Sequence, residues 1–379
     1  MRMLHITPQA PAMKSGGGIG IYQTMYSITS IADEVDYVGP EIEDAEIKSR
    51  YSKLYELHKS DNLFELLYTL ANFQINKRFY SWRKQNIDFS KYDAFIIDFT
   101  KQDYVIKDIV KKVNNKKIIV RVHNVEYDYS KADFHSNKTL NKYIVHLLSR
   151  KNEKYMLKKA SNVVVLTSND KERIEELYNI DPKKMSIIPV SVGHIDVKSK
   201  CRENMAKTKI LVTGSLWFGP NAEGIYWLID NVLSNLSEKF EVIVAGHNPS
   251  EKMKIKCKEQ DIKLIESPET MAPIFSETDI VAVPIFDGAG MKVKIAEAMS
   301  YGKFVISTSY GLVGYEKSNE GIFAYADTPE EFIKAFECYE EMEYAEKQML
   351  KKKIFSEYQS KYSLEASICR FQEIINDII

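Results

Sequence analysis

Short apolar segments alternate with helix-like segments along most of the chain. In the first half the predicted strands are Leu4–Ile6, Val35–Val38, Ala94–Phe99, Ile118–Val122, Val163–Leu166 and Ser186–Pro189. In the second half they are Ile210–Thr213, Glu241–Ala245, Ile262–Ile265, Ile280–Pro284, Phe304–Thr308 and Gly321–Ala324. Several of these runs are apolar at every position, which is typical of parallel strands buried on both faces. The alternation predicts the α/β class, with two doubly wound, Rossmann-like domains.

The pattern weakens once, in a polar stretch of mixed charge. We therefore predict an N-terminal domain over 1–190, a linker over 191–207, a second domain over 208–360 and a C-terminal helix over 361–379 that could return to the first domain. Because ligands in such sheets bind beyond the carboxyl ends of the strands, the cleft between the two domains is the expected site.

The first domain contains an insert near 44–85 that is predicted to be helical. Its leucines and phenylalanines are mixed with basic residues, including Lys77, Arg78, Arg83 and Lys84. One interpretation is an amphipathic surface that touches acidic lipid headgroups. The other, which we favour because acidic residues dilute the basic face, is a pair of packed helices whose cations are solvated.

Composition and charge narrow the function classes. The 379 residues are 44% apolar and 28% charged, and the formal net charge of −1 excludes a globally basic nucleic-acid binder. The four cysteines form no CxxC pair and the histidines show no metal-ligand spacing, so no metal ion and a reducing compartment are expected. No apolar run approaches the roughly 20 residues of a membrane span. We expect a cytoplasmic protein, with a peripheral position at the inner membrane face as an alternative.

A glycine cluster, Gly16–Gly20, follows the first predicted strand and precedes a helical run at Ile21–Ile31. Glycines there let the backbone approach a ligand closely, with amides free to face an anion. The cluster is no dinucleotide fingerprint, because GxGxxG starting at Gly16 would require a glycine where Ile21 stands. The alternative is a loop that binds nothing.

His123 directly follows an apolar strand. The carboxyl end of that strand would deliver the imidazole into the cleft, where it could donate a hydrogen bond to a polar substrate. A lone histidine is also often structural, so both interpretations stay open at this point.

The segment 281–299 reads as a strand, a glycine turn and a helix that begins near Gly290. A helix N-terminus reached through glycines can bind an anion, and Lys292 and Lys294 add positive charge. Glu297 is predicted about two turns into the helix, where its carboxylate would suit sugar hydroxyls better than phosphate. These residues predict a nucleotide site, with amides and lysines for the diphosphate and a carboxylate for the ribose.

The segment 287–314 (DGAGMKVKIAEAMSYGKFVISTSYGLVG) resembles the donor-site signature of retaining glycosyltransferases of family 4, which have the GT-B fold. Further similar segments are Gly16–Gly20, VHNVEYDY around His123, VVVLTSND at 163–170 and VTGSLWFGPNAEG at 212–224. The resemblance implies that Glu297 holds the ribose and that Gly290, Met291 and Lys292 lie along the diphosphate and sugar. It also implies that His123 contacts the donor sugar and that Gly17 and Gly18 approach the phosphates.

The sequence departs from the family pattern at three places. Ala289 stands where many members have a glutamate, which we attribute to a subgroup with a glycine-rich turn. The frequent Arg/Lys pair after the first strand of the second domain is not evident, so Gly214, Ser215, Asn221 and the two lysines are expected to serve the diphosphate. The usual Pro-Asn-Gly-Val-Asp is replaced by the sequence Pro189–Gly193.

These features predict transfer of a hexosyl-type sugar from a nucleotide diphosphate sugar to an acceptor hydroxyl, with retention and without a metal ion or other cofactor. The expected acceptor is a glycan or a lipid-linked molecule in surface polysaccharide or glycoconjugate synthesis, and no nucleic-acid partner is expected. Two alternatives share the fold, a nucleotide-sugar 2-epimerase and a non-catalytic partner subunit. An oxidoreductase would need the absent dinucleotide fingerprint.

Overall fold

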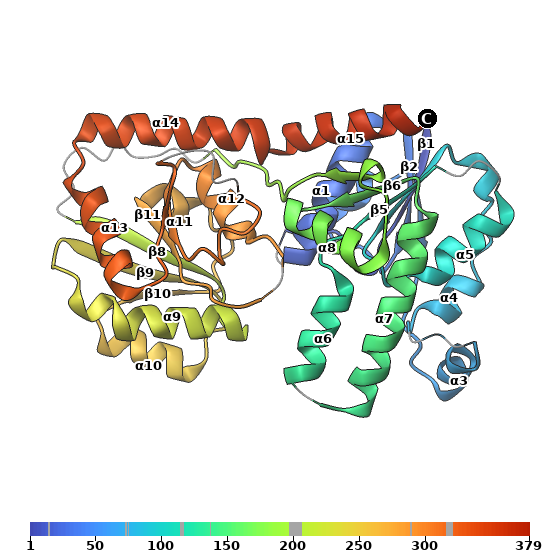
Figure 1. Ribbon diagram of the computed structural model, residues 1–379, viewed down its shortest axis with the longest axis horizontal. Helices are drawn as coiled ribbons and strands as arrows, with labels where there is room; N and C mark the ends of the chain where they lie inside the picture. Colours follow the sequence, from blue (N-terminus) through green and yellow to red (C-terminus); the bar gives the residue numbers. More distant parts are fainter. Residues whose placement is uncertain are drawn as a thin grey trace. The chain divides into compact units, whose positions relative to one another are not determined.

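The chain divides into two compact units, Met1–Pro189 with Ser367–Ile379 and Val190–Ala366 (Figure 1). The computed structural model describes residues 1–13, 16–72, 74, 76–113, 117–136, 138–196, 207–288, 290–315 and 321–379. Most of the predicted linker, 197–206, therefore lies outside the described residues. Within the described ranges, no helix is long and apolar enough to cross a bilayer.

The first unit contains a seven-stranded parallel sheet in the order β3-β2-β1-β4-β5-β6-β7. Its strands are β1 (Arg2–Ile6), β2 (Glu34–Gly39), β3 (Lys53–Glu56), β4 (Ala94–Asp98), β5 (Ile118–Arg121), β6 (Asn162–Val165) and β7 (Met185–Ile187). Its helices are α1 (Gly16–Ile31), α2 (Ala45–Ser49), α3 (Leu63–Ala71), α4 (Phe79–Arg83), α5 (Asp103–Lys112), α6 (Glu126–Ser136), α7 (Leu140–Lys159) and α8 (Ser168–Tyr178), with short 3₁₀ turns at Phe89–Lys91 and Pro182–Lys184.

The sheet of the first unit is covered on both faces. Alternate residues of β4 enter different cores, since Phe95 and Ile97 belong to one apolar cluster while Ala94 and Ile96 belong to the other. Helices α5 and α7 pack against the first cluster, and α1 and the C-terminal helix α15 (Leu364–Ile378) pack against the second. This burial on both sides explains why the central strands are apolar at every position.

The prediction of an all-helical insert near 44–85 is wrong in one respect. The edge strand β3 lies inside it and pairs with β2 in parallel. The sequence Lys53-Leu54-Tyr55-Glu56 contains no apolar run. An edge strand that exposes one face to solvent does not require apolar residues at every position. The helices α3 and α4 do pack together through Tyr68, whose ring contacts those of Phe79 and Tyr80.

The second unit contains a six-stranded parallel sheet in the order β10-β9-β8-β11-β12-β13. Its strands are β8 (Thr208–Ser215), β9 (Phe240–His247), β10 (Lys263–Glu266), β11 (Ile280–Val283), β12 (Phe304–Ser307) and β13 (Phe323–Tyr325). Its helices are α9 (Gly219–Asn231), α10 (Glu251–Glu259), α11 (Ala272–Glu277), α12 (Val293–Ser300), α13 (Pro329–Glu341) and α14 (Tyr344–Lys361), with a 3₁₀ turn at Leu233–Asn235. The two parallel sheets confirm the predicted fold class, and each predicted strand is present with ends that shift by two residues or fewer.

The C-terminal helix α15 belongs mainly to the first unit, although the residues that precede it belong to the second. Its side chains Phe371, Ile374 and Ile375 are buried in the core of the first sheet. In addition, the Ser367 hydroxyl accepts a hydrogen bond from the Gln23 amide of α1 at 3.0 Å. The first unit is thus built from two separate parts of the chain.

Candidate functional site

Each sheet changes its winding direction at one place, and the candidate residues gather there. In the first unit the change falls between β1 and β4, and in the second between β8 and β11. Loops on the two sides of such a point diverge at the carboxyl ends of the strands, which leaves room for a ligand. His123 follows β5, beside β4, whereas Gly214 lies at the carboxyl end of β8 and Lys292 and Lys294 follow β11.

In the first unit, two histidines share one buried carboxylate. Asp98 ends β4, and its Oδ1 accepts a hydrogen bond from Nε2 of His123 at 2.7 Å. Its Oδ2 accepts one from Nε2 of His5 in β1 at 2.6 Å, and Nδ1 of His5 lies 2.7 Å from the hydroxyl of Tyr51. Register alone brings these strands together, because His5 lies opposite Ile96, two residues before Asp98.

The protonation of this cluster follows from its contacts. Burial would raise the pKa of Asp98, but the hydrogen bonds from His123 and His5 outweigh it and hold that pKa below the usual carboxyl range. Burial lowers the pKa of His123, although Asp98 opposes this, so the neutral ring is favoured. An ionised carboxylate only accepts, hence Nε2 of His123 carries the proton and Nδ1 carries a lone pair. The ring offers a ligand an acceptor, not the donor that we expected from the sequence.

The N-terminal end of α1 packs tightly against this cluster. The helix predicted over Ile21–Ile31 begins five residues earlier, because Gly16–Gly20 form the first turns of α1 itself. A Cβ on Gly20 would lie only 2.5 Å from Nδ1 of His123, so the glycine makes space for the ring. Gly18 is buried and its carbonyl accepts from the amide of Ala12, whereas a Cβ on Gly17 would approach the flexible end of Gln9. Phosphate contact by Gly17 and Gly18 stays a prediction.

Arg121 ties the cluster to α1. Its buried guanidinium donates to the backbone carbonyl of Gly20 at 3.0 Å, the Thr24 hydroxyl at 2.7 Å and Oε1 of the Gln23 side chain at 2.6 Å. The Thr24 hydroxyl in turn donates to Asp98 at 3.0 Å. Sequence analysis missed Asp98, His5 and Arg121, although each is a polar residue within or at the end of an apolar run.

In the second unit, Gly214, Asn221 and Lys294 meet at the carboxyl end of β8. Nζ of Lys294 donates to Oδ1 of Asn221 at 2.9 Å, and Nδ2 of Asn221 donates to the Ser215 carbonyl at 3.0 Å. A Cβ on Gly214 would lie 2.8 Å from both Nδ2 of Asn221 and Nζ of Lys294. The absence of a side chain at Gly214 is therefore what lets the amide and the ammonium sit beside the strand.

The loop before α12 is held by the side chain of Lys292. The helix begins at Val293, with Lys292 as its N-cap, so the predicted start near Gly290 is three residues early. Nζ of Lys292 donates to the carbonyls of Gly290 at 2.8 Å and Gly288 at 3.3 Å. The Met291 side chain is buried, where its sulfur accepts from the Val190 amide at 3.5 Å. Gly290 has a φ of 72°, and Ala289 lies outside the described residues.

Glu297 and the two lysines are partly buried near one another, which shifts their protonation. Burial raises the pKa of Glu297 to about 7, with Lys294 opposing the change. Burial likewise lowers the pKa of Lys294 and of Lys292, each to about 8, against the nearby charges of Glu297 and Asp287 respectively. All three groups therefore titrate within about a unit of neutral pH, as is common for groups that change charge on binding a ligand.

The first turn of α12 is bridged by a buried tyrosine that sequence analysis did not find. The Tyr315 hydroxyl donates to the Lys292 carbonyl at 2.8 Å and accepts from the Ala296 amide at 3.2 Å. It therefore stands between a helical carbonyl and the amide four residues later, which would otherwise bond directly. Burial raises the pKa of Tyr315 well above its usual value, so the hydroxyl stays protonated.

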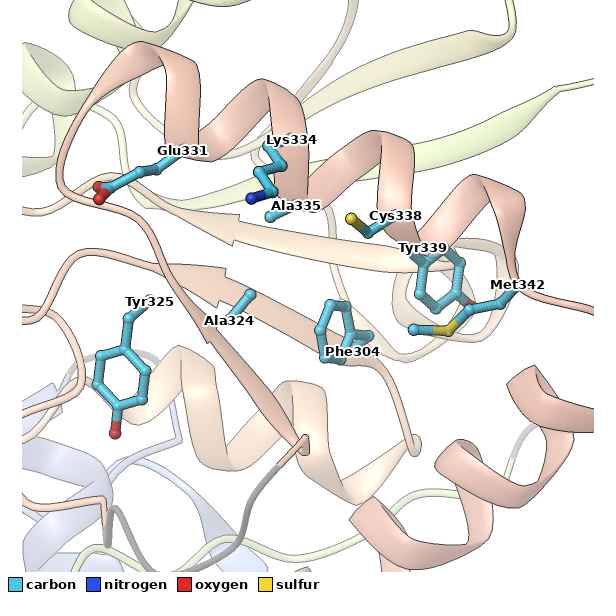
Figure 2. A pocket seen from close by; sticks show the side chains of 9 residues that line it. All are labelled: Phe304, Ala324, Tyr325, Glu331, Lys334, Ala335, Cys338, Tyr339 and Met342. Atoms are coloured by element: carbon cyan, nitrogen blue, oxygen red, sulfur yellow. The ribbon is translucent and has the colours of Figure 1, made fainter.

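A separate pocket of the second unit contains none of these residues. It lies between α13 and the strands β12 and β13 (Figure 2), and its lining residues are Phe304, Ala324, Tyr325, Glu331, Lys334, Ala335, Cys338, Tyr339 and Met342. The Glu331 carboxylate is already engaged, since it accepts from the amides of Asp327 and Thr328 at the start of α13. Because neither Gly214 in β8 nor Lys294 in α12 contributes to its lining, this pocket is not the candidate donor site.

Comparison with known proteins adds a family model, a curated relative and solved structures. Residues 207–339 match the family model described as Glycosyl transferases group 1. A protein of Klebsiella pneumoniae described as "Uncharacterized 44.6 kDa protein in cps region" is 27% identical over 214 residues, which are 52% of this chain and 53% of that protein. The chain thus spans about half the length of this curated relative.

Solved structures match the whole chain. A glycosyltransferase from Rickettsia africae ESF-5 has a TM-score of 0.70 at 15% identity, covering 100% of this chain and 98% of that one. Alr3699/HepE from Anabaena, solved in complex with UDP, has a TM-score of 0.67 at 12% identity and covers 100% of both chains. At such identities the likeness concerns the fold. The chain has the fold of the GT-B glycosyltransferases, and a segment of its second unit matches the family model for group 1 glycosyltransferases.

Proposed function

We propose that this chain is a retaining glycosyltransferase of family 4 that transfers a hexosyl-type sugar from a nucleotide diphosphate sugar to an acceptor hydroxyl. The observation that carries the proposal is the group formed by Gly214, Asn221, Lys294 and Glu297 at the switch point of the second sheet. It combines an ammonium and a carboxylate at the start of a helix reached through glycines. Those are the groups needed to bind a diphosphate and a ribose.

The diphosphate is the leaving group, so its growing negative charge is what the site must stabilise. Lys294, Lys292 and the amides at the start of α12 are the donors that we assign to this role, together with Gly290 and Met291 through their backbone. A donor that is preorganised in this way commonly contributes about 2.7–4 kcal/mol to the transition state. The proposed proton acceptor for the incoming hydroxyl is the leaving phosphate itself, so no metal ion or second catalytic carboxylate is required.

His123 is assigned to the donor sugar. Its Nε2 proton is committed to Asp98, so the group that remains is the lone pair on Nδ1, which can accept a hydrogen bond from a sugar hydroxyl. Gly17 and Gly18 are proposed to meet the phosphates through α1. The acceptor is proposed to be a glycan or a lipid-linked molecule of surface polysaccharide synthesis, with the protein placed peripherally at the inner membrane face. The description of the Klebsiella relative, which places it in a cps region, supports that setting.

The proposal is tested by titrating UDP into the wild-type chain and into Glu297→Ala by calorimetry. We expect the variant to bind at least tenfold more weakly with an unchanged melting temperature, because a lost hydrogen bond to a charged group is worth about 1.5–3 kcal/mol. Glu259→Ala, at the exposed end of α10, is the matched control and should bind normally. Equal UDP affinity in all three proteins would refute the donor site.

Turnover distinguishes the proposed transfer from other chemistry. Incubation with nucleotide sugars and a glycan acceptor should give a product whose new linkage has the anomeric configuration of the donor, as proton NMR can show. Inversion of that configuration would contradict the retaining assignment. Conversion of the nucleotide sugar into its 2-epimer without any acceptor would instead establish the epimerase alternative.

A further inference from the structure

Helix α7 carries an apolar stripe that stays largely exposed, although the ring of Tyr143 contacts that of Phe134 in α6. Its first two turns expose Leu140, Tyr143, Ile144 and Leu147, with 75%, 44%, 43% and 51% of each residue accessible to solvent. These positions are three or four residues apart, so they lie on one face of the helix. Globular proteins rarely expose large apolar side chains in such a contiguous row unless the surface contacts something.

The same face continues as a row of cations. Lys151, Lys154 and Lys158 follow Leu147 at spacings of four, three and four residues, and Arg150 and Lys159 flank them. Beside this half of the helix is a groove lined by Lys107, Lys151, Asn152, Lys154, Tyr155, Lys158 and Lys159. Lys107 is paired with Asp103, but within the described residues the α7 cations Arg150, Lys151, Lys154, Lys158 and Lys159 form no ion pair.

The acidic groups around α7 leave this charge unneutralised. Glu153, the one acidic residue of α7, points inward, where it accepts hydrogen bonds from the amides of Glu126 and Tyr127 and from the Tyr178 hydroxyl. On the neighbouring helix α6, Asp128 is paired with Arg173 and Asp133 with Lys142. The outward face of α7 is therefore apolar in its first half and positive in its second.

The dimensions of α7 suit an interface between hydrocarbon and phosphate. At about 1.5 Å per residue, Lys151 lies about 6 Å along the helix from Leu147, and Lys154 lies about 15 Å from Ile144. Amphipathic segments enter the headgroup boundary by about 5–10 Å. When α7 lies in the plane of the bilayer with this face down, its apolar half enters the headgroup boundary and the cations on the same face lie beside the lipid phosphates.

Helix α3, in the same unit, presents a second apolar face. Leu63, Phe64, Leu67 and Leu70 are all more than half exposed, whereas Glu65 and Thr69 are buried. In Figure 1 α3 and the first turns of α7 lie toward the same, lower end of the first unit. The insert near 44–85 has two interpretations, a surface that contacts lipid and a pair of packed helices. The exposed apolar side chains of α3 favour the contact surface over packed helices alone.

We propose that the outward face of α7 is a docking surface for the anionic surface of a lipid bilayer. The inference rests on the peripheral location included in the proposed function, and it names the surface that would produce it. Leucine and isoleucine in the apolar half contribute insertion, and each cation contributes attraction to anionic lipid. A polyanion such as RNA would use the cations but leave the apolar half without a partner, so a lipid surface accounts for both halves of the face.

The test is flotation of the full chain with vesicles of phosphatidylcholine alone or mixed with phosphatidylglycerol. We expect binding to the mixed vesicles, little binding to the neutral ones, and weaker binding as salt rises from about 0.1 M to about 1 M, where screening shortens the Debye length from about 10 Å to about 3 Å. Lys154→Glu/Lys158→Glu and, separately, Ile144→Ser should each reduce binding about tenfold or more. Matched changes on exposed positions of the second unit, Lys258→Glu/Lys352→Glu and Ile255→Ser, should leave it unchanged.

Three results would overturn the docking surface: equal binding to neutral and anionic vesicles, equal loss in the α7 variants and their controls, or Ile144-dependent dimerisation in place of vesicle binding. Binding to RNA that survives Ile144→Ser, without vesicle binding, would also overturn it. UDP titration of the same proteins separates this inference from the donor site. Vesicle binding lost in an α7 variant with UDP affinity retained supports the surface, whereas vesicle binding without UDP binding refutes the transferase alone.

Discussion

Nε2 of His123 lies 2.7 Å from Oδ1 of Asp98, and this hydrogen bond determines what the histidine can offer. The carboxylate of Asp98 is fully buried and also accepts a hydrogen bond from His5. Water cannot solvate its negative charge there, so the hydrogen bonds from the neighbouring side chains must stabilise it. The tautomer of His123 is therefore set by a residue of the adjacent strand. Nδ1, the ring nitrogen on the side of Gly20, is left as the acceptor.

Asp98→Asn should lower the free energy of unfolding by about 1.5–3 kcal/mol at pH 7, the range for a hydrogen bond to a charged group. Because the folded-state pKa of Asp98 is below its unfolded value, its ionisation stabilises the fold above about pH 4, and that contribution is lost as the pH falls toward the folded pKa. The difference between wild type and variant in urea unfolding should therefore shrink from pH 7 to pH 3. The exposed Asp61→Asn is the control, and parallel pH profiles for wild type and Asp98→Asn would contradict the prediction.

Gly20→Ala should destabilise the protein by about 1–3 kcal/mol, the usual cost of overpacking. The added methyl would lie 2.5 Å from Nδ1 of His123 and would push the ring away from Asp98. Gly17→Ala in the same helix meets only the flexible end of Gln9 and should be neutral or slightly stabilising. Thermal and urea unfolding of both variants provide the measurement. Equal effects at the two glycines would show that the ring is not confined by Gly20.

UDP should bind most tightly between about pH 7 and pH 8. Below about 7 the Glu297 carboxylate takes up a proton and loses its ability to accept from the ribose hydroxyls. Above about 8 the Lys294 ammonium loses its proton, and the attraction to the diphosphate falls. Calorimetric titrations over a pH series should show both limbs. Glu297→Gln should abolish the acid limb and Lys294→Met the alkaline one, and a flat wild-type profile would exclude both roles.

Tyr315→Phe should weaken UDP binding although Tyr315 is a positioning residue and not a contact of the nucleotide. Loss of its hydroxyl removes the bridge between the Lys292 carbonyl and the Ala296 amide, at a cost of about 0.5–1.5 kcal/mol in stability. The start of α12, and with it Lys292, would then be held less firmly. Tyr325→Phe, at an exposed tyrosine of β13, is the control. Reduced stability with unchanged UDP affinity would assign Tyr315 to folding alone.

The apolar runs predicted the fold because both sheets are parallel and covered on two faces. The edge strand β3 was not predicted, because strands were recognised by apolar runs that indicate burial on both faces, and Lys53–Glu56 is only half-buried. The first turns of α1 were not predicted to be helical, for a different reason. Five residues that include four glycines have poor helix propensity, and only close packing of Gly20 against His123 explains a helix there.

The candidate residues from Gly290 to Glu297 could be singled out because they are near one another in sequence, whereas Gly214 and Asn221, which lie beside Lys294, are about 70 to 80 residues away along the chain. The cluster around Asp98 could not, since His5, Asp98 and Arg121 come from three strands that are distant along the chain. They meet only through the register of the sheet, in which Asp98 lies opposite Arg121. The register of the strands cannot be read from a single sequence. The role of polar residues inside apolar runs therefore becomes clear only when the pairing of the strands is known.

Because the core of the first unit takes in Phe371, Ile374 and Ile375, that core is complete only when the last helix has been synthesised. Residues 190–366 leave the ribosome before that point as a complete unit, whereas one face of the first sheet is covered by α1 but not yet by α15. Domains fold as units during synthesis, and exposed apolar faces are where chaperones act and aggregation starts. A chain that ends before residue 371 would contain the whole of the second unit but would lack these three apolar side chains from the core of the first.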